Sequence, residues 1–572
     1  MRRHRLRLAF LAVALCASPV GAQRVRGELY LPDGQSRAVG VLVEASDPGG
    51  RIVARTLTGE RGEFALTLPG VGQYSLRALR IGHRPTALGR LDVGEGEHPP
   101  LRVLLEDRPI TLPKLVVSEP RTCRIRTDSG QLVARLWGEA SKALGALEVA
   151  RTRPLLEATW VVYDRVLDST GRSVRRQSQQ QRKGLSSSPF VSLPADSLAR
   201  VGYVTRDAQG VVYQAPDAAV LLSDSFAAAH CFQVEPGGES RASWIGVAFR
   251  PAGARALPDI AGTFWLDRET AELRLLEYTY TGVSSAVAEA GAGGRLEFAR
   301  LSTGHWIVSR WHIRMPVVTR RLGGFLTSGV RTQDREMLTA IHVRGGEVLS
   351  ARRGASVLYS VNARAFEAVV LSSDSLVRAG SATVELVGTN YVSAVDSTGR
   401  VRIDAVLPGR YVARFTTPQL QALGVGARER QVEVSDTPRA LVDTMKLPTG
   451  EEVVSKACGP ETSRRGAAML FGTVVDESAQ PTAGARVTVE WWSRLVTEPG
   501  ASGVLSTDRL ETTSDAHGRW RVCGVPRDHL LRIRASSENR FSEPERFRIP
   551  IATALIMRVL VLRRSSAPES LR

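Results

Sequence analysis

The chain has 572 residues, of which 43% are hydrophobic and 23% charged, and its formal net charge is +18. This length predicts several domains, and the composition excludes a wholly disordered protein. The 52 glycines and 29 prolines are typical of domains built from short β-strands and many turns. Beyond the N-terminus no apolar run approaches the roughly 20 residues of a membrane-spanning helix, so no such helix is predicted in the mature chain.

Residues 1–22 have the pattern of a secretory signal peptide. Arginines at positions 2, 3, 5 and 7 precede an apolar stretch at 8–17 and the small residues of 20–22. We expect cleavage before Gln23 and an exported mature protein in the periplasm, at the outer membrane or outside the cell. Cys16 follows Leu15, which is bulkier than the residue that a lipoprotein signal places there, so Cys16 is interpreted as part of the discarded signal.

The basic charge does not by itself predict a nucleic-acid partner. Removal of residues 1–22 takes away four arginines and no acidic residue, which leaves +14 on the mature chain. The arginines are spread along every segment, which favours a solvated basic surface over a nucleic-acid footprint. The densest basic stretch is 172–183, and its glutamines and serines predict an exposed hairpin tip.

A turn glycine followed by alternating apolar residues occurs three times, at Gly62, Gly399 and Gly518. Apolar residues stand two and four positions after each glycine, and a large apolar residue stands twelve positions after it. These residues are Phe64, Leu66 and Tyr74, then Val401, Ile403 and Tyr411, then Trp520, Val522 and Leu530. Alternation is the period of a half-buried strand, and glycine permits the positive φ of a tight turn. Each copy therefore predicts a small β-sandwich.

The third copy also contains Gly472, Asp476, the step Gly484–Ala485, and Asp515 before Gly518. This order of residues resembles the carboxypeptidase regulatory-like domain, a transthyretin-like sandwich. The resemblance implies seven-stranded Greek-key sandwiches at 23–107, 354–447 and 448–572, of which the second is degenerate. It implies no catalytic residues, and it makes carbohydrate a plausible ligand class because the wider fold group includes carbohydrate-binding modules.

Residues 108–353 differ from the repeats. Asp128 and Ser129 offer an N-cap, and apolar residues then recur at helical spacing from Leu132 to Leu147, which predicts one amphipathic helix. Alternating segments predict antiparallel strands at 160–164, 244–249, 262–267, 273–280, 296–300 and 306–315. The predicted fold class is mainly β, with three Greek-key β-sandwiches flanking an α+β domain of one helix on a curved antiparallel sheet.

The strand segments 262–278 and 304–308 of this region resemble the half-barrel of LolA-like lipoprotein carriers. The resemblance implies a concave apolar face that either holds acyl chains or is filled by the protein itself. Trp265, Leu275 and Trp306 are the residues expected to line a lipid cavity there. A periplasmic lipid or lipoprotein carrier is therefore the alternative function.

Four cysteines remain after signal removal, an even number in an oxidising compartment. Three pairings are possible. Cys123 and Cys231 bracket one region and Cys458 and Cys523 bracket another, so pairing within each region is predicted. Because no CxxC motif occurs, structural disulfides are favoured over a metal or redox site.

The sequence lacks the metalloprotease, nucleophile-elbow, P-loop and dinucleotide motifs, so no catalytic residue, metal site or cofactor is predicted and the protein is not expected to be an enzyme. His305 and His312 lie seven positions apart on one predicted strand and point to opposite faces, which favours a structural role. The serine–aspartate runs at 223–225 and 372–375 have turn composition and no histidine at the spacing of a base. Both are interpreted as solvated turns.

Trp491 and Trp492 are the candidate ligand-binding residues. Adjacent residues of a strand face opposite sides, so at least one indole is expected to be exposed, where it could stack on a sugar. Packing in the core and at the sheet edge is the alternative for both. The sequence thus predicts a non-catalytic, exported cell-envelope binding or scaffolding protein whose partner is a polysaccharide or an envelope protein. Lipid is the alternative partner, and nucleic acid is not expected.

Overall fold

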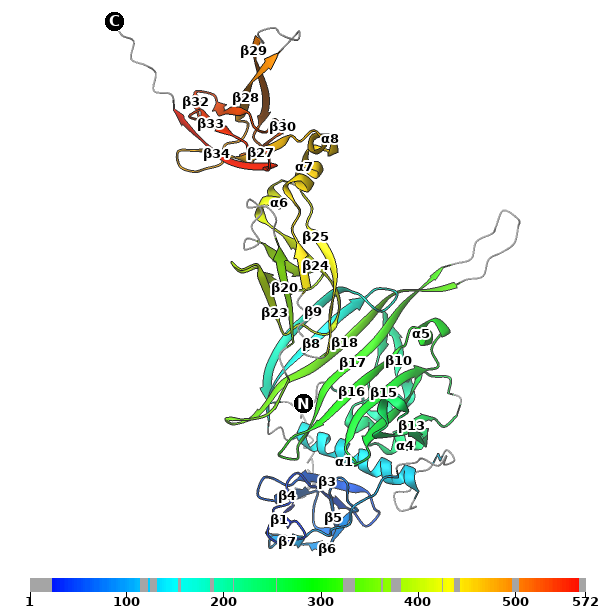
Figure 1. Ribbon diagram of the computed structural model, residues 1–572. Helices are drawn as coiled ribbons and strands as arrows, with labels where there is room; N and C mark the ends of the chain where they lie inside the picture. Colours follow the sequence, from blue (N-terminus) through cyan, green and yellow to red (C-terminus); the bar gives the residue numbers. More distant parts are fainter. Residues whose placement is uncertain are drawn as a thin grey trace, which may run out of the picture. The chain divides into compact units, whose positions relative to one another are not determined.

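The computed structural model describes residues 23–113, 122–123, 131–152, 156–185, 190–208, 210–253, 255–321, 335–361, 364–371, 382–423, 425–436, 443–495 and 504–564. The predicted signal peptide, the helix cap at 128–129 and the serine run at 372–375 lie outside these residues. The described chain is mainly β (Figure 1) and divides into two compact units. One unit is Met1–Arg165 with Gln179–Val361, and the other is Val166–Ser178 with Asn362–Arg572. The domain boundaries expected at 107, 353 and 447 stay predictions.

All three repeats form sandwiches with one strand topology. In each, the first strand pairs antiparallel with the fourth and parallel with the last. The second strand pairs with the third and the fifth. The first sandwich consists of β1 (Gln23–Tyr30), β2 (Leu42–Ser46), β3 (Ile52–Leu57), β4 (Glu63–Leu68), β5 (Gly72–Leu79), β6 (Thr86–Val93) and β7 (Leu101–Leu104).

The other two sandwiches repeat this order. The second consists of β20 (Ala365–Leu371), β21 (Thr383–Leu386), β22 (Val392–Ala394), β23 (Arg400–Asp404), β24 (Gly409–Thr416), β25 (Arg428–Val434) and β26 (Asp443–Lys446). The third consists of β27 (Ala468–Asp476), β28 (Arg486–Leu495), β29 (Val504–Thr513), β30 (Arg519–Val525), β31 (Leu530–Ser537), β33 (Glu545–Arg548) and β34 (Leu555–Arg564), with a short additional strand β32 (Arg540–Phe541). The helices α6 (Pro418–Ala422), α7 (Gly450–Cys458) and α8 (Pro460–Arg464) accompany them.

The turn glycines behave as predicted: all three have positive φ, between 71° and 83°. The apolar residues at the second and fourth positions after each glycine are buried. At the twelfth position Tyr74 and Tyr411 are also buried, and their hydroxyls donate to the carbonyls of Gly70 and Leu407. These bonds tie each tyrosine to the turn four residues before it.

The twelfth-position prediction is wrong for the third copy. Leu530 is 46% exposed, and its neighbour Leu531 fills the core position instead. Counted from the turn glycine, the inward position comes one residue later in the third copy than in the other two, and Asp528 just before β31 adopts a positive φ of 58°. The extra residue shifts the inward side chain by one position, because side chains alternate along a strand.

The central sheet has ten strands in the order β12-β13-β14-β15-β16-β17-β18-β8-β9, with β19 paired to β18. Neighbouring strands from β12 to β18 pair antiparallel, and so do β18 and β19. The sheet is strongly curved (Figure 1). The strands are β8 (Glu157–Leu167), β9 (Val174–Leu185), β12 (His230–Pro236), β13 (Trp244–Pro251), β14 (Asp259–Asp267), β15 (Leu273–Thr281), β16 (Gly293–Arg300), β17 (Trp306–Arg321), β18 (Arg335–Arg353) and β19 (Ser356–Ser360). All six predicted strand segments lie within them.

Shorter elements complete this region. They are α2 (Ala195–Val201), α3 (Ala218–Leu221), α4 (Asp224–Ala229), α5 (Ser285–Glu289), the single 3-10 turn at Glu239–Arg241, and the hairpin of β10 (Val204–Asp207) and β11 (Gly210–Tyr213). Apart from the run at 223–225, these elements were not predicted from the sequence.

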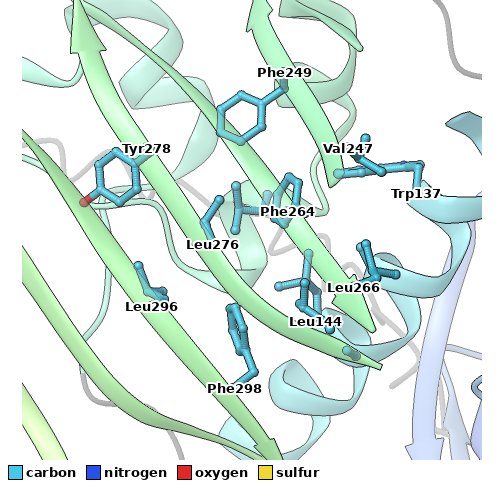
Figure 2. Packing of buried hydrophobic residues seen from close by; sticks show 14 of the residues in the cluster. Trp137, Leu144, Val247, Phe249, Phe264, Leu266, Leu276, Tyr278, Leu296 and Phe298 are labelled. Carbon is cyan, nitrogen blue, oxygen red and sulfur yellow. The ribbon is translucent and has the colours of Figure 1, made fainter. Parts of the chain in front are cut away.

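Helix α1 (Leu132–Thr152) packs on the concave face of the sheet. Figure 2 shows Trp137 and Leu144 of α1 beside Phe249, Phe264 and other inward side chains of the strands. Contrary to the amphipathic prediction, the opposite face of α1 is also covered. The first sandwich packs there, so closely that a Cβ on Gly145 would lie 2.8 Å from the side chain of Leu42.

A buried ion pair fixes this second face of α1. Lys142 Nζ donates to Glu139 Oε1 at 2.6 Å and to the carbonyls of Arg80 and His83 at 2.9 and 2.6 Å. The N–H of Gly82 donates to Glu139 Oε2 at 2.8 Å. Burial raises the pKa of Glu139 and lowers the pKa of Lys142, and their mutual attraction opposes both shifts. The pair thus holds the 80–83 loop of the first sandwich against the helix.

The basic stretch 172–183 is not simply the exposed hairpin tip that its composition predicts. The hairpin turn lies at 168–171, and residues 174–183 form most of β9. Gln177 is buried, and its N–H donates to the carbonyl of Gly388 at 2.7 Å. The polar composition predicted full exposure, but the Gln177 side chain packs against the second sandwich.

Candidate functional site

The third sandwich carries a long hairpin formed by β28 and β29. Strand β28 pairs with β31 only as far as Trp491, whereas its pairing with β29 continues to Leu495. Figure 1 shows the hairpin extending beyond the other strands of this sandwich. The far part of the hairpin, beyond Trp491, is therefore a two-stranded arm.

The two candidate tryptophans lie where this arm begins, on opposite faces of β28. Trp491 is partly buried against the sandwich core, together with Leu510 and Phe547. Trp492 is 37% exposed. All nine tryptophans lie among the described residues, and Trp492 is the most exposed of them.

Polar side chains flank the exposed indole on its own face of the hairpin. Thr507 stands directly opposite Trp492 on β29, and Arg509 stands opposite Glu490, the next residue of β28 on that face. Glu490 is buried and accepts a hydrogen bond from Arg532 Nε at 2.8 Å. A flat apolar ring bordered by a hydroxyl and a guanidinium is an arrangement suited to a sugar ring.

A groove on the same sandwich was missed by the sequence analysis. It has a volume of about 660 Å³ and lies between α6 and the outer face of β27, β30 and β34. Phe471, Met557 and Val559 form its apolar side, and Arg519 and Arg521 are among its polar groups. The sequence of β34 carried a signal for this groove. Every residue of 555–562 except Arg558 is apolar, so both faces of the strand carry apolar side chains.

The structure forms both predicted disulfides, Cys123–Cys231 and Cys458–Cys523. Cys458 ends α7, and Cys523 lies on the outer face of β30. The bond therefore anchors α7 beside the sheet, where Val453 and Val454 of the helix are fully buried.

The concave face of the central sheet is filled. Side chains of α1, α3 and the strands form one continuous buried cluster there, which includes Trp306 as expected. A pocket against α1 has a volume of about 30 Å³, room for about two water molecules. A pocket of this size does not accommodate an acyl chain.

The expectation that Trp265 and Leu275 face this cavity is wrong. Both are buried, but they lie opposite each other in the β14–β15 pair and outside the concave cluster, which contains Phe264, Leu266 and Leu276 instead. Trp265 faces away because its neighbours Phe264 and Leu266 face the cluster. A β-bulge skips Arg274, so that Leu273 faces the cluster and Leu275 does not.

The structure does not bring His305 and His312 together. His305 is buried just before β17 and lies 3.0 Å, through Nδ1, from Thr303 Oγ1. His312 lies on β17 opposite Arg295, and burial together with the charge of Arg295 lowers its pKa to about 4. Within the described ranges, no three His, Cys, Asp or Glu side chains gather as a metal site.

The serine–aspartate run at 223–225 is a helix start and not a free turn. Ser223 caps α4, and its hydroxyl accepts the N–H of Phe226 at 3.1 Å. Ser225 donates to Asp196 at 2.7 Å.

None of the helices in the described part of the chain has the length and hydropathy needed to span a bilayer.

Comparisons with known proteins assign no family. No protein-family model and no curated protein match the chain. Three solved structures with partial likeness are the Bacillus anthracis TIE protein, a Streptococcal ancillary pilin and BcpA, the major pilin subunit of Bacillus cereus. Their identities are 11%, 12% and 8%, and their TM-scores are 0.17, 0.14 and 0.14. The matches cover 63%, 40% and 95% of this chain and 64%, 82% and 100% of those chains. With TM-scores this far below 0.5, they say nothing about the function of this chain.

Proposed function

We propose that this chain is an exported, non-catalytic binding and scaffolding protein of the cell envelope, and that its third sandwich binds carbohydrate. The observation that carries the proposal is the exposed face of Trp492, bordered by Thr507 and Arg509 on a projecting hairpin. Stacking of a sugar on an indole needs such a flat apolar surface beside hydrogen-bonding groups.

Three further features support the scaffolding part of the proposal. The chain repeats one sandwich topology three times, as do proteins that present a binding surface on a series of modules. Its two disulfides suit an oxidising compartment outside the cytoplasm. The proposed kinship with carboxypeptidase regulatory-like domains, which serve mainly as accessory modules, points the same way.

The alternative of a lipid or lipoprotein carrier has no comparable support. A carrier needs an apolar cavity of the size of an acyl chain, and α1 fills the concave face of the central sheet. We therefore do not propose a carrier function or a kinship with LolA-like proteins.

Binding of the mature chain, from Gln23 onward, to a panel of envelope polysaccharides tests the proposal. We expect retention on at least one polysaccharide and its loss in Trp492→Ala. Phe541→Ala is the matched control, because Phe541 is an exposed aromatic residue of the same sandwich that lies on another strand. Equal retention of both variants would place the binding surface elsewhere, and no retention of the wild-type chain would contradict carbohydrate binding.

A further inference from the structure

The last strand of the third sandwich differs from its counterparts in length. Strands β7 and β26 have four residues each, whereas β34 has ten. All three occupy the same place, parallel to the first strand of their sandwich. Short edge strands limit unwanted pairing between proteins, and the third sandwich lacks this protection.

The free edge of β34 is correspondingly long. One side pairs with β27 over residues 555–562, and on the other side only Arg563 and Arg564 pair, with β32. Among the described residues, the backbone of 555–562 has no strand partner on that second side. Arg558 makes side-chain contacts on this stretch: Nη1 donates to the carbonyl of Met557 at 3.0 Å, Nε lies 3.4 Å from Glu545 Oε2, and the guanidinium lies 4.6 Å from the centre of the Phe547 ring. Arg558 is partly exposed and can turn away from this carbonyl when a strand adds.

The outer face of β34 is apolar throughout, whereas the equivalent face of each other copy includes a polar or charged residue. Met557, Val559 and Val561 are 43%, 49% and 38% exposed. By pairing register, Val559 corresponds to Arg102 of β7 and to Thr444 of β26. Natural edge strands commonly carry polar or charged residues at such positions.

The stripe is complementary to itself. In an antiparallel pair of two β34 strands centred on Val559, the two Val559 side chains face each other, and Met557 of each strand faces Val561 of the other. An added strand must bring an unpaired backbone edge and apolar residues at alternate positions. A second copy of β34 brings both by symmetry.

We propose that the third sandwich mediates dimerisation of this chain through antiparallel pairing of β34 with β34 of a second copy. The pairing extends the sheet across both copies and sets the two stripes of Met557, Val559 and Val561 side by side on one face, where they bury each other in part. It also joins two Trp492 surfaces in one assembly, which increases avidity for a repetitive ligand. Dimerisation does not depend on carbohydrate binding.

Sedimentation velocity of the mature chain over a range of concentrations tests the proposal. We expect a dimer, and a monomer for Val559→Lys, in which two ammonium groups would oppose each other at the centre of the pair. Leu104→Lys is the matched control: Leu104 is exposed and corresponds to Val561 in the first sandwich, so this variant should remain dimeric. A wild-type monomer at every concentration, or a dimer that persists in Val559→Lys, would overturn the proposal.

Cysteine crosslinking tests the register with a variant that keeps the edge small and uncharged. In the proposed pair, Val559→Cys places two thiols opposite each other, at a separation that a disulfide spans. Mild oxidation should therefore crosslink most of this variant as a dimer, whereas Val561→Cys, which faces Met557, should crosslink far less. Equal crosslinking of the two variants, or none of either, would contradict the proposed pairing.

Discussion

Glu490 on β28 accepts hydrogen bonds from both Nε and Nη2 of Arg532, its cross-strand partner on β31. A glutamate on the second strand and an arginine on the fifth form this pair in every sandwich. The matching pairs are Glu44 with Arg77 and Glu385 with Arg414. The three copies therefore share a side-chain arrangement as well as a topology, although the sequence repeat did not reveal it.

Burial of the glutamate should decide how much this pair contributes to stability. Arg532→Met removes the main partner of a buried carboxylate, so we expect a loss of about 2 kcal/mol in the free energy of unfolding. Arg414→Met is the control, because the Glu385 side chain is 44% exposed and solvent-accessible ion pairs contribute under about 1 kcal/mol. Urea unfolding of the full chain measures both. A larger loss in Arg414→Met would contradict this explanation.

The Cys458–Cys523 bond should stabilise the third sandwich locally. It closes a loop with a sequence separation of 65 residues, for which the chain-entropy model gives about 4 kcal/mol. In the double variant Cys458→Ser/Cys523→Ser we expect faster hydrogen exchange in β27 and β30. Removal of Cys123 and Cys231 is the control and should leave these strands unchanged. Unaltered exchange in the first variant would show that α7 is held without the disulfide.

Loss of Lys142 alone should lower the free energy of unfolding more than replacement of both Glu139 and Lys142. Lys142→Met leaves a buried carboxylate without its cation, so we expect a loss of about 3–5 kcal/mol in the free energy of unfolding. The double variant Glu139→Gln/Lys142→Met removes the charge and keeps an acceptor for the N–H of Gly82, and it should recover part of this loss. Chemical denaturation compares the two, and equal stability of both variants would contradict the assigned role.

His312 should make the folded chain less stable in mild acid. Its pKa is lowered to about 4 in the folded state, mainly by burial, whereas an unfolded histidine titrates near 6.5. The stabilising contribution is therefore complete above about pH 6.5 and is lost as the pH falls towards 4. Replacement by asparagine should reduce the fall in unfolding free energy between pH 7 and pH 5 by up to about 2 kcal/mol. Identical pH profiles of wild type and His312→Asn would contradict this shift.

Alternation predicted the strands well wherever one face of a strand is apolar and the other polar. It missed β18, because Gly345 and Gly346 interrupt the pattern where Tyr163 and Trp311 pack. A Cβ on Gly345 would lie 2.5 Å from the ring of Tyr163. Glycines that make room for a neighbouring ring cannot be recognised without knowing which strand lies alongside.

The candidate site was predictable only in part. Adjacent tryptophans on a strand necessarily face opposite sides, so an exposed indole at 491–492 could be expected. Thr507 and Arg509 could not be assigned to it, because their position depends on the register of β28 and β29. The second covered face of α1 likewise arises from contact between distant segments, which periodicity does not encode.

The most direct test of the proposed function is calorimetric titration of a bound polysaccharide into the wild-type chain and two variants, Trp492→Phe and Trp492→Leu. Stacking requires a flat ring, so the phenylalanine variant should keep most of the affinity, while the leucine variant, equally apolar but not planar, should lose about tenfold or more. Equal affinities of all three proteins would contradict a role for Trp492 in binding carbohydrate.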